Sequence, residues 1–374
     1  MHNNLCMAFC LLFSIAQLQS NDHIIERIKT MTTEKVTYHQ EEIFFENKID
    51  SIRLGGTLTV PTLSGKYPAA ILIAGYGPND RDLTGMGHTY FKVLAEYLTQ
   101  QGIAVLRYDK RGVGQSTGNW ATVTSQDLTR DVMAGIDYLK TRQEIDAASI
   151  GLIGLSEGGL IAAIVASQYM DIAFAVLMAP HVALGVDDLV YQAGLQLQAD
   201  GASNEFIERD KQMRTAVYTI VREELDPIER QKKVKEIILN YLEEQPATQK
   251  EEAQKLPFAF TSENVDMLIA KLTAPSYRFF TTYNPHEVLT KIQCPVLIIA
   301  SPQDAMVSCH KTFPILQHAF NEAGKNNATF ITLPNLNHLF QPCKTGALAE
   351  YATIKETMSP SVKQLIADWI LKNS

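Results

Sequence analysis

The sequence predicts an α/β fold with a doubly wound, mostly parallel sheet, and three observations lead to this prediction. Short apolar runs alternate with segments of helical periodicity up to about residue 180 and again from residue 293. This alternation is typical of strand-helix-strand units with right-handed crossovers. A Gly-x-Ser-x-Gly turn at residues 154–158 lies between such a run and a helical segment, and a polar segment without β-branched runs interrupts the alternation at residues 182–292.

Composition excludes several classes of protein. The chain has 374 residues, of which 46% are hydrophobic, so it can bury a sizeable core. Its net charge is −8, from 33 basic and 41 acidic side chains, and no cluster of lysine or arginine is segregated onto one segment. We therefore expect no nucleic-acid partner.

The first twenty residues resemble a secretory leader. An apolar run at residues 5–16 is too short to span a membrane but suits the central part of a signal peptide, and residues 14–16 suit a cleavage site. The run is preceded by His2 and by no lysine or arginine, so the usual positive end is missing. We interpret residues 1–20 as a signal peptide, with an N-terminal helix packed on the domain as the alternative. The mature protein is then expected to be periplasmic or secreted, without stable membrane insertion.

Residues 21–181 form the first part of the predicted core. Strands are expected where apolar runs end at glycine, proline or polar residues, namely at residues 43–46, 49–60, 69–74, 103–106, 149–153 and 173–178. Helices are expected where apolar residues recur every three or four positions, namely at residues 90–99, 125–139 and 160–166.

Residues 182–292 are predicted to form a helical cap, because Glu, Lys, Gln and Arg dominate long stretches of this segment. The alternation resumes in residues 293–374, which form the second part of the core. Strands are expected there at residues 294–300 and 328–333, and helices at 310–323 and 362–370.

Ser156 is the candidate nucleophile. In a strand-turn-helix of this kind the serine takes a strained backbone conformation, and side chains at the flanking positions would collide with the adjoining strand or helix. Gly154 and Gly158 remove that collision. The helix that follows supplies free N–H groups and a partial positive charge where an oxyanion would form.

A serine hydroxyl needs a base, and the candidate base is His338. It lies in the loop directly after the last predicted strand, at the sheet edge where Ser156 should emerge. His181, which also follows a strand, and His88, which lies near a glycine-rich loop, are the alternatives.

The imidazole in turn needs an anion to orient it, and Asp304 is the candidate because it follows the strand at residues 294–300. The chain order is then serine, acid, histidine. Asp187 or Asp188 is the alternative acid.

The oxyanion donors are expected to be the backbone N–H groups of Tyr76 and Glu157, since glycines on both sides of Tyr76 let the main chain approach a bound acyl group. The Glu157 side chain is interpreted as a first-turn charge on the helix dipole. The loop at residues 109–116 has glycines without a dinucleotide or phosphate-binding spacing, so it is interpreted as a structural turn. We expect no cofactor and no metal.

The predicted mature chain keeps three of the five cysteines, Cys294, Cys309 and Cys343, which is an odd number and no disulfide framework. Cys309 follows the Asp304 loop and Cys343 follows the His338 loop. A bridge between these two cysteines is a hypothesis that would join the loops of acid and base.

Four motifs together carry a resemblance to a known family. Residues 75–82, 107–112, 154–159 and 337–340 resemble bacterial α/β-hydrolase esterases of the EstD type, over a region from about residue 49 to the C-terminus. The resemblance implies an α/β-hydrolase fold and the roles of nucleophile, acid and base for Ser156, Asp304 and His338. The chain departs from the commoner family pattern at Leu155, where histidine is frequent, and at Tyr76, where a smaller residue is usual.

The expected function is hydrolysis of short-chain carboxylic esters through an acyl-enzyme. A small-molecule ester is the expected partner, and the oligomeric state stays open. A peptidase, aminopeptidase or thioesterase on the same three residues is the enzyme alternative, because the fold does not select the leaving group. A ligand-binding module without catalysis is the alternative from another class.

The preference for short acyl chains rests on Tyr76, which takes volume near the reacting carbonyl, and on the cap. Apolar residues at 188–191 and 195–197 are expected to face the pocket.

Overall fold

The computed structural model of the chain describes residues 37–62 and 64–374. The predicted leader, residues 1–20, therefore lies outside the described residues.

One eight-stranded sheet forms the centre of the protein, in the order β1-β2-β6-β3-β7-β8-β9-β10. β2 runs antiparallel to both of its neighbours, and all the pairs from β6 to β10 are parallel. The strands are β1 (Tyr38–Asn47), β2 (Ile52–Pro61), β3 (Tyr67–Ile73), β6 (Ala104–Tyr108), β7 (Ile145–Leu155), β8 (Ala175–Met178), β9 (Val296–Ala300) and β10 (Ala328–Thr332). The predicted mostly parallel sheet is confirmed.

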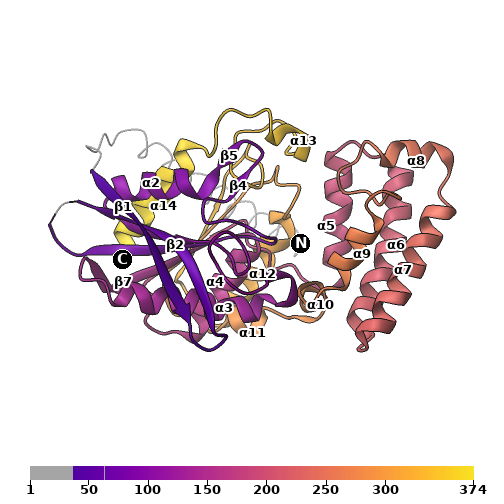
Figure 1. Cartoon of the computed structure of the whole chain (residues 1–374). Helices are drawn as coiled ribbons and strands as arrows, with labels where there is room; N and C mark the ends of the chain where they lie inside the picture. The colour runs from indigo at the N-terminus through magenta and orange to yellow at the C-terminus, as the bar shows by residue number, and fades with distance from the viewer. Residues whose placement is uncertain (1–36, 63) are drawn as a thin grey trace, which may run out of the picture.

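Helices cover both faces of this sheet, as Figure 1 shows. α2 (Tyr90–Gln100) and α14 (Pro360–Asn373) pack on one face. The other face is covered by α3 (Ser125–Lys140), α4 (Glu157–Gln168) and α12 (Cys309–Glu322). β8 and β9 are buried along their whole length, because helices exclude water from both sides of them.

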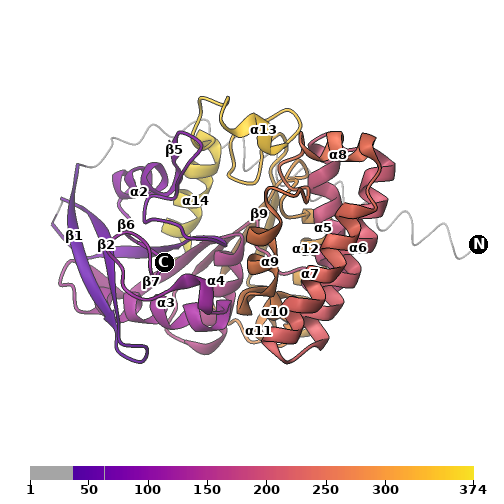
Figure 2. The same ribbon diagram turned by 45° about the vertical axis from the view of Figure 1, so that its right-hand side comes forward.

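Between β8 and β9 the chain forms a series of helices, which we call the helical segment (residues 182–292). They are α5 (Val186–Ala199), α6 (Asn204–Glu223), α7 (Pro227–Glu243), α8 (Ala247–Ala253), α9 (Val265–Thr273), α10 (Pro275–Thr282) and α11 (His286–Leu289). Figures 1 and 2 show α5 to α9 as a bundle beside the sheet, with α10 at the junction. The bundle has its own apolar interior, which includes Val217, Val234, Ile238 and Phe280.

The apolar positions of α5 face two ways: Tyr191 and Leu195 line a hollow together with Asp304, whereas three others pack inside the helical segment. Leu189 and Val190 lie in the interior of the bundle, and Leu197 lies in a second small apolar cluster with Phe206. They support the helical segment itself, because α5 has α6 as its neighbour and the apolar stripe of each helix is buried against the other.

Four short elements were not predicted. They are β4 (Thr84–Gly85), β5 (His88–Thr89), the 3-10 helix η1 (Trp120–Thr122) and α13 (Leu348–Tyr351). Each is too short to produce a periodic pattern of apolar residues. In the described part of the chain, no helix combines the length and apolar character that crossing a membrane requires.

Candidate active site

Ser156 lies at the sharp turn from β7 into α4. Its backbone has φ 58° and ψ −120°, a conformation that side chains rarely adopt. A Cβ on Gly154 would lie 2.1 Å from the Gly158 carbonyl oxygen, and one on Gly158 would lie 2.0 Å from the Ile73 carbonyl oxygen. Glycine is therefore required at both positions, for the steric reason expected from the sequence.

The structure brings Asp304 and His338 together. Asp304 Oδ2 lies 2.7 Å from His338 Nδ1, and both side chains are buried. Asp304 Oδ1 accepts the backbone N–H groups of Met306 and Val307 at 2.7 and 2.9 Å. The carboxylate is thus held on both oxygens, so it can fix the orientation of the imidazole.

Ser156 and this pair emerge at the same edge of the sheet, because they follow β7, β9 and β10, whose carboxyl ends all point to that edge. Within the described residues Ser156 Oγ makes no hydrogen bond. Its main chain is anchored to the loop after β8, since the Ser156 carbonyl accepts the N–H of His181 at 3.0 Å.

The loop with Tyr76 lies directly beside the serine. A Cβ on Gly75 would lie 3.2 Å from Ser156 Cβ. The Gly75 carbonyl accepts from Lys110 Nζ at 2.5 Å and from Asn79 Nδ2 at 2.8 Å. In a trans peptide the N–H points opposite to the C=O, so these two donors fix the direction of the Tyr76 N–H.

Glu157 is the first residue of α4, and its carboxylate is buried behind the serine. It accepts from Ser125 Oγ at 2.8 Å and lies 3.4 Å from Lys110 Nζ. Lys110 therefore connects the α4 N-terminus to the Tyr76 loop. The interpretation of residues 109–116 as a turn alone missed this lysine, although its position directly after a central strand was a usable signal.

The Tyr76 side chain joins the sheet to the helical segment. Its ring packs edge to face against Trp120, Tyr277 and Phe280, with centroids 5.8 to 5.9 Å apart. Tyr277 and Phe280 belong to α10. Tyr76 therefore links the loop beside the serine to α10 through a cluster of aromatic rings.

His181 is a further site histidine, to which the sequence assigned only the role of alternative base. Its ring centroid lies 5.2 Å from that of Phe280, and its side chain forms a hydrogen bond with the Gln192 side chain. Nε2 is shielded from solvent and has no partner in the described part of the chain. Burial lowers the pKa of His181 to about 4, and the nearby His338 contributes in the same direction.

The remaining alternatives lie elsewhere. His88 uses both ring nitrogens to hold the C-terminal region, through Thr357 and the Ile354 carbonyl. Asp188 pairs with Lys311, and Asp187 is an exposed residue in the first turn of α5. Neither Asp187 nor Asp188 bonds to His338.

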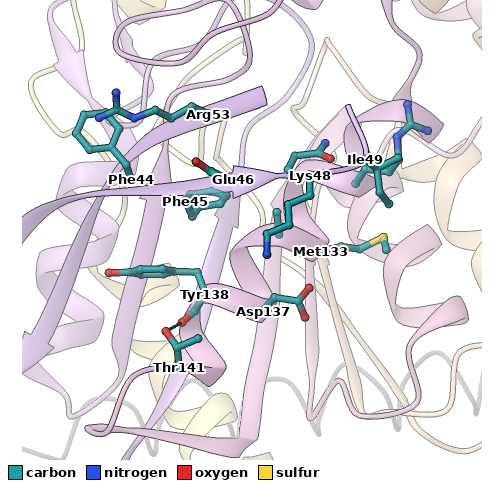
Figure 3. A pocket seen from close by; sticks show the side chains of 13 residues that line it. Phe44, Phe45, Glu46, Lys48, Ile49, Arg53, Met133, Asp137, Tyr138 and Thr141 are labelled. Carbon is teal, nitrogen blue, oxygen red and sulfur yellow. Dashed lines mark hydrogen bonds between the residues drawn. The ribbon is translucent and has the colours of Figure 1, made fainter. Parts of the chain in front are cut away.

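Two hollows differ in their relation to the site. One of about 290 Å³ is lined by Asp304 and Ser308 of the core and by Tyr191 and Leu195 of α5. The other, a groove of about 500 Å³, lies between β1 and α3 at the outer edge of the sheet and is lined by residues such as Phe45 and Tyr138 (Figure 3). The groove includes none of the candidate site residues.

Cys309 and Cys343 are free thiols, so the hypothesis of a bridge between them is wrong. Burial raises the pKa of both thiols, that of Cys343 to about 11.

Among the described residues one group has the geometry of a metal site: the ligand atoms of His286, His318 and Glu322 lie within 4.8 Å of one another, on α11 and α12.

Comparison with known proteins agrees with this architecture. Esterase EstD of Thermotoga maritima is 33% identical over 124 residues, which are 33% of this chain and 30% of EstD. The chain thus spans less than a third of that relative. An esterase of Pyrococcus furiosus, Pf2001, superposes with a TM-score of 0.52 at 16% identity, over 90% of each chain. Est1E of Butyrivibrio proteoclasticus, solved with ferulic acid, gives 0.51 at 16% identity, over 88% of this chain and 98% of its own.

The sheet, the serine turn and these neighbours define an α/β-hydrolase-fold protein that is similar to esterases. This confirms the resemblance noted in the sequence. Residues 50–338 match the family model of the X-Pro dipeptidyl-peptidases (S15 family), and the chain belongs to that family.

Proposed function

We propose that the protein is a serine carboxylesterase that uses Ser156, His338 and Asp304. One observation carries the proposal: a buried aspartate-histidine pair, joined at 2.7 Å, at the sheet edge where Ser156 takes its strained conformation. Esterases among the relatives and structural neighbours support hydrolysis of an ester.

The reaction begins when Ser156 Oγ attacks the ester carbonyl and its proton passes to His338 Nε2. Asp304 holds Nδ1–H and stabilises the imidazolium. The tetrahedral intermediate then expels the alcohol, which takes the proton from Nε2. Water, deprotonated by the same nitrogen, attacks the acyl-enzyme and releases the carboxylic acid and Ser156 Oγ–H.

The oxyanion is held by the backbone N–H groups of Tyr76 and Glu157 in this proposal. Lys110 and Asn79 hold the Gly75 carbonyl and thereby preorganise the Tyr76 N–H. The Glu157 N–H begins α4 and carries the partial positive charge of the helix end. Preorganised donors of this kind stabilise the transition state without reorganisation during the reaction.

The helical segment acts as a cap in this proposal. Tyr277 and Phe280 of α10 contact Tyr76, and Tyr191 and Leu195 of α5 line a hollow next to Asp304. Because Tyr76 follows Gly75, whose backbone lies beside Ser156, we expect these rings to limit the length of the acyl group, and we propose a preference for acetyl to about butyryl esters.

A second candidate is cleavage of an X-Pro dipeptide, because the matching family model carries that description. Such a peptidase must bind the substrate ammonium group. The carboxylate next to the serine, Glu157, is already engaged by Lys110 and Ser125, and for this reason we favour the ester.

Substrate profiling on one purified sample tests the choice. We expect p-nitrophenyl acetate and butyrate to be hydrolysed, and Gly-Pro and Ala-Pro p-nitroanilides to be hydrolysed at a small fraction of that rate. The reverse order would replace the esterase proposal by the peptidase.

Labelling tests the nucleophile independently of the substrate. A fluorophosphonate should label the wild type and Ser167→Ala, a change at the far end of α4, but not Ser156→Ala. Equal labelling of all three proteins would exclude Ser156 as the nucleophile.

A further inference from the structure

A third hollow, of about 510 Å³, lies where the helical segment meets the core. One face of α10 forms a wall of it, through Pro275, Arg278, Phe279 and Thr282, while α7 contributes Arg230. Figures 1 and 2 show α10 at this junction. We call the hollow the junction pocket; its remaining lining residues are Thr124 and Leu225.

Arg230 is the unusual member of the junction pocket. It is 6% exposed, and its Nη1 donates to the Glu224 carbonyl at 3.1 Å. Nε is shielded from solvent and has no hydrogen-bond partner among the described residues. Burying a guanidinium without a full set of hydrogen-bond acceptors costs free energy. The Arg230 side chain therefore lacks an acceptor that a bound anion could supply.

Arg278 is a second arginine that lines the junction pocket, and it adds another positive charge next to Arg230. Burial lowers the pKa of Arg230, and the positive charge of Arg278 lowers it further. The two guanidinium groups therefore repel each other. In the described part of the chain neither forms a salt bridge to a carboxylate.

The nearby acids are already used. Glu224 pairs with Lys233, and Asp226 accepts the N–H groups of Ile228 and Glu229 at the start of α7.

The other buried arginines contrast with this arrangement. Arg111 binds both oxygens of Asp131 at 2.7 Å, and Arg107 Nε donates to Asp82 at 2.7 Å. Arg214 in the helical segment pairs with Asp210. Among the buried arginines of the described residues, Arg230 is therefore the one that has no carboxylate partner.

We propose that the junction pocket binds a small organic anion, with a carboxylate or phosphate between Arg230 and Arg278. The planar guanidinium presents paired N–H donors that match the oxygens of such groups. Leu225, Pro275 and Phe279 give the pocket an apolar wall, which suits an anion with an attached hydrocarbon or aromatic part.

The site lies on the opposite face of α10 from the contacts to Tyr76. Tyr277 and Phe280 touch the Tyr76 ring, whereas Arg278 and Phe279 line the junction pocket. An anion bound there would hold α10 to α7 and stabilise the junction between segment and core. The inference does not depend on which bond the enzyme hydrolyses.

The test is whether the full chain binds anions. Thermal unfolding and calorimetric titration measure this binding. Benzoate and inorganic phosphate are the probes, and sodium chloride at equal ionic strength is the reference. We expect a saturable rise in Tm with benzoate, a smaller one with phosphate, and none beyond the ionic-strength effect with chloride.

Two variants locate the site. Arg278→Gln should weaken the affinity for benzoate about tenfold, the loss expected for a charge-assisted hydrogen bond. Its Tm without anion should equal or exceed that of the wild type, because a like charge is removed. Arg222→Gln, an exposed arginine of α6 paired with Glu223, is the matched control and should bind as the wild type does.

Equal benzoate affinity in wild type and Arg278→Gln would overturn the proposal, as would the absence of saturable binding in the wild type. If phosphate raised Tm as much as benzoate or more, the proposal that the ligand has an organic part would be wrong.

Discussion

The sheet core and the helical segment differ in how completely their buried polar side chains are hydrogen-bonded. In the core, Arg111, Asp131 and Asn47 form a closed network in which both carboxylate oxygens accept hydrogen bonds. The helical segment is less than a third of the chain, yet it holds more of the shielded side-chain polar atoms without partners than the remainder of the described residues. Asp210 Oδ1, Arg230 Nε and the Tyr241 hydroxyl are examples.

This difference in hydrogen bonding affects how strictly each region is held in one arrangement. Satisfied buried networks hold one arrangement, whereas partly satisfied ones leave alternatives of similar free energy. The core therefore suits a catalytic site that needs fixed distances, and the segment suits recognition of ligands that supply the missing partners. The four predictions below test this contrast, beginning with the largest expected effect.

Loss of the catalytic side chains should abolish activity without unfolding the core. Ser156→Ala and His338→Ala should each reduce kcat by about 10⁶-fold, and the double variant by no more, because members of a triad act as one unit. Asp304→Asn should cost about 10⁴-fold, since the histidine then takes the wrong tautomer. Hydrolysis of p-nitrophenyl acetate measures these rates; losses that multiply in the double variant would contradict a triad.

The two buried arginines should differ in their contribution to stability. Arg111→Met should lower the free energy of unfolding by about 3 to 5 kcal/mol, because Asp131 is left buried and unpaired. Arg230→Met should change it by at most about 1 kcal/mol, because no carboxylate loses its partner and an unsatisfied charge is removed. Urea denaturation followed by circular dichroism compares them, and equal losses would remove the contrast between the regions.

Acid should destabilise the protein through His181. Its pKa is about 4 in the folded chain against the ordinary value of 6.5, so between these values the unfolded chain binds the additional proton. The stabilising contribution is therefore complete above about pH 6.5 and is lost as the pH falls towards 4. His181→Gln should reduce the pH slope of the free energy of unfolding by up to about 1.4 kcal/mol per unit.

Urea denaturation at several pH values between 4 and 6.5 measures that slope. His310→Gln, an exposed histidine, serves as the control. An unchanged slope in His181→Gln would show that the imidazole is not kept neutral by the fold.

The smallest effect concerns Tyr76, where the two regions meet. Tyr76→Ala should shift the best acyl chain to a longer one, with each added methylene worth about 1 kcal/mol, or roughly fivefold in kcat/KM. A series of p-nitrophenyl esters from acetate to octanoate measures the shift, with Tyr76→Phe as the control that keeps the ring. An unchanged chain-length profile in Tyr76→Ala would show that the ring does not limit the acyl pocket.

The sequence was sufficient for the elements that carry local signals. The runs at residues 69–74 and 294–300 are strands because they are apolar without interruption, and they correspond to β3 and β9. The serine turn could be predicted because its glycines are demanded by contacts within a few residues and with one neighbouring strand.

The placement of Asp304 and His338 at one edge also followed from the sequence, because residues after successive parallel strands meet there. Their 2.7 Å contact came only from the structure, since it depends on two loops that are far apart in the chain.

Thus the sequence by itself determined the order of strands and helices, the serine turn and the edge of the sheet that carries the candidate site. These features arise from local steric and hydrophobic patterns, which the chain displays residue by residue. Only the tertiary structure decided which buried polar groups have partners: Lys110 under the Gly75 carbonyl, His181 beside His338, and Arg230 without a carboxylate. Such partners come from segments distant in the chain, so their presence or absence depends on three-dimensional packing that periodicity does not encode.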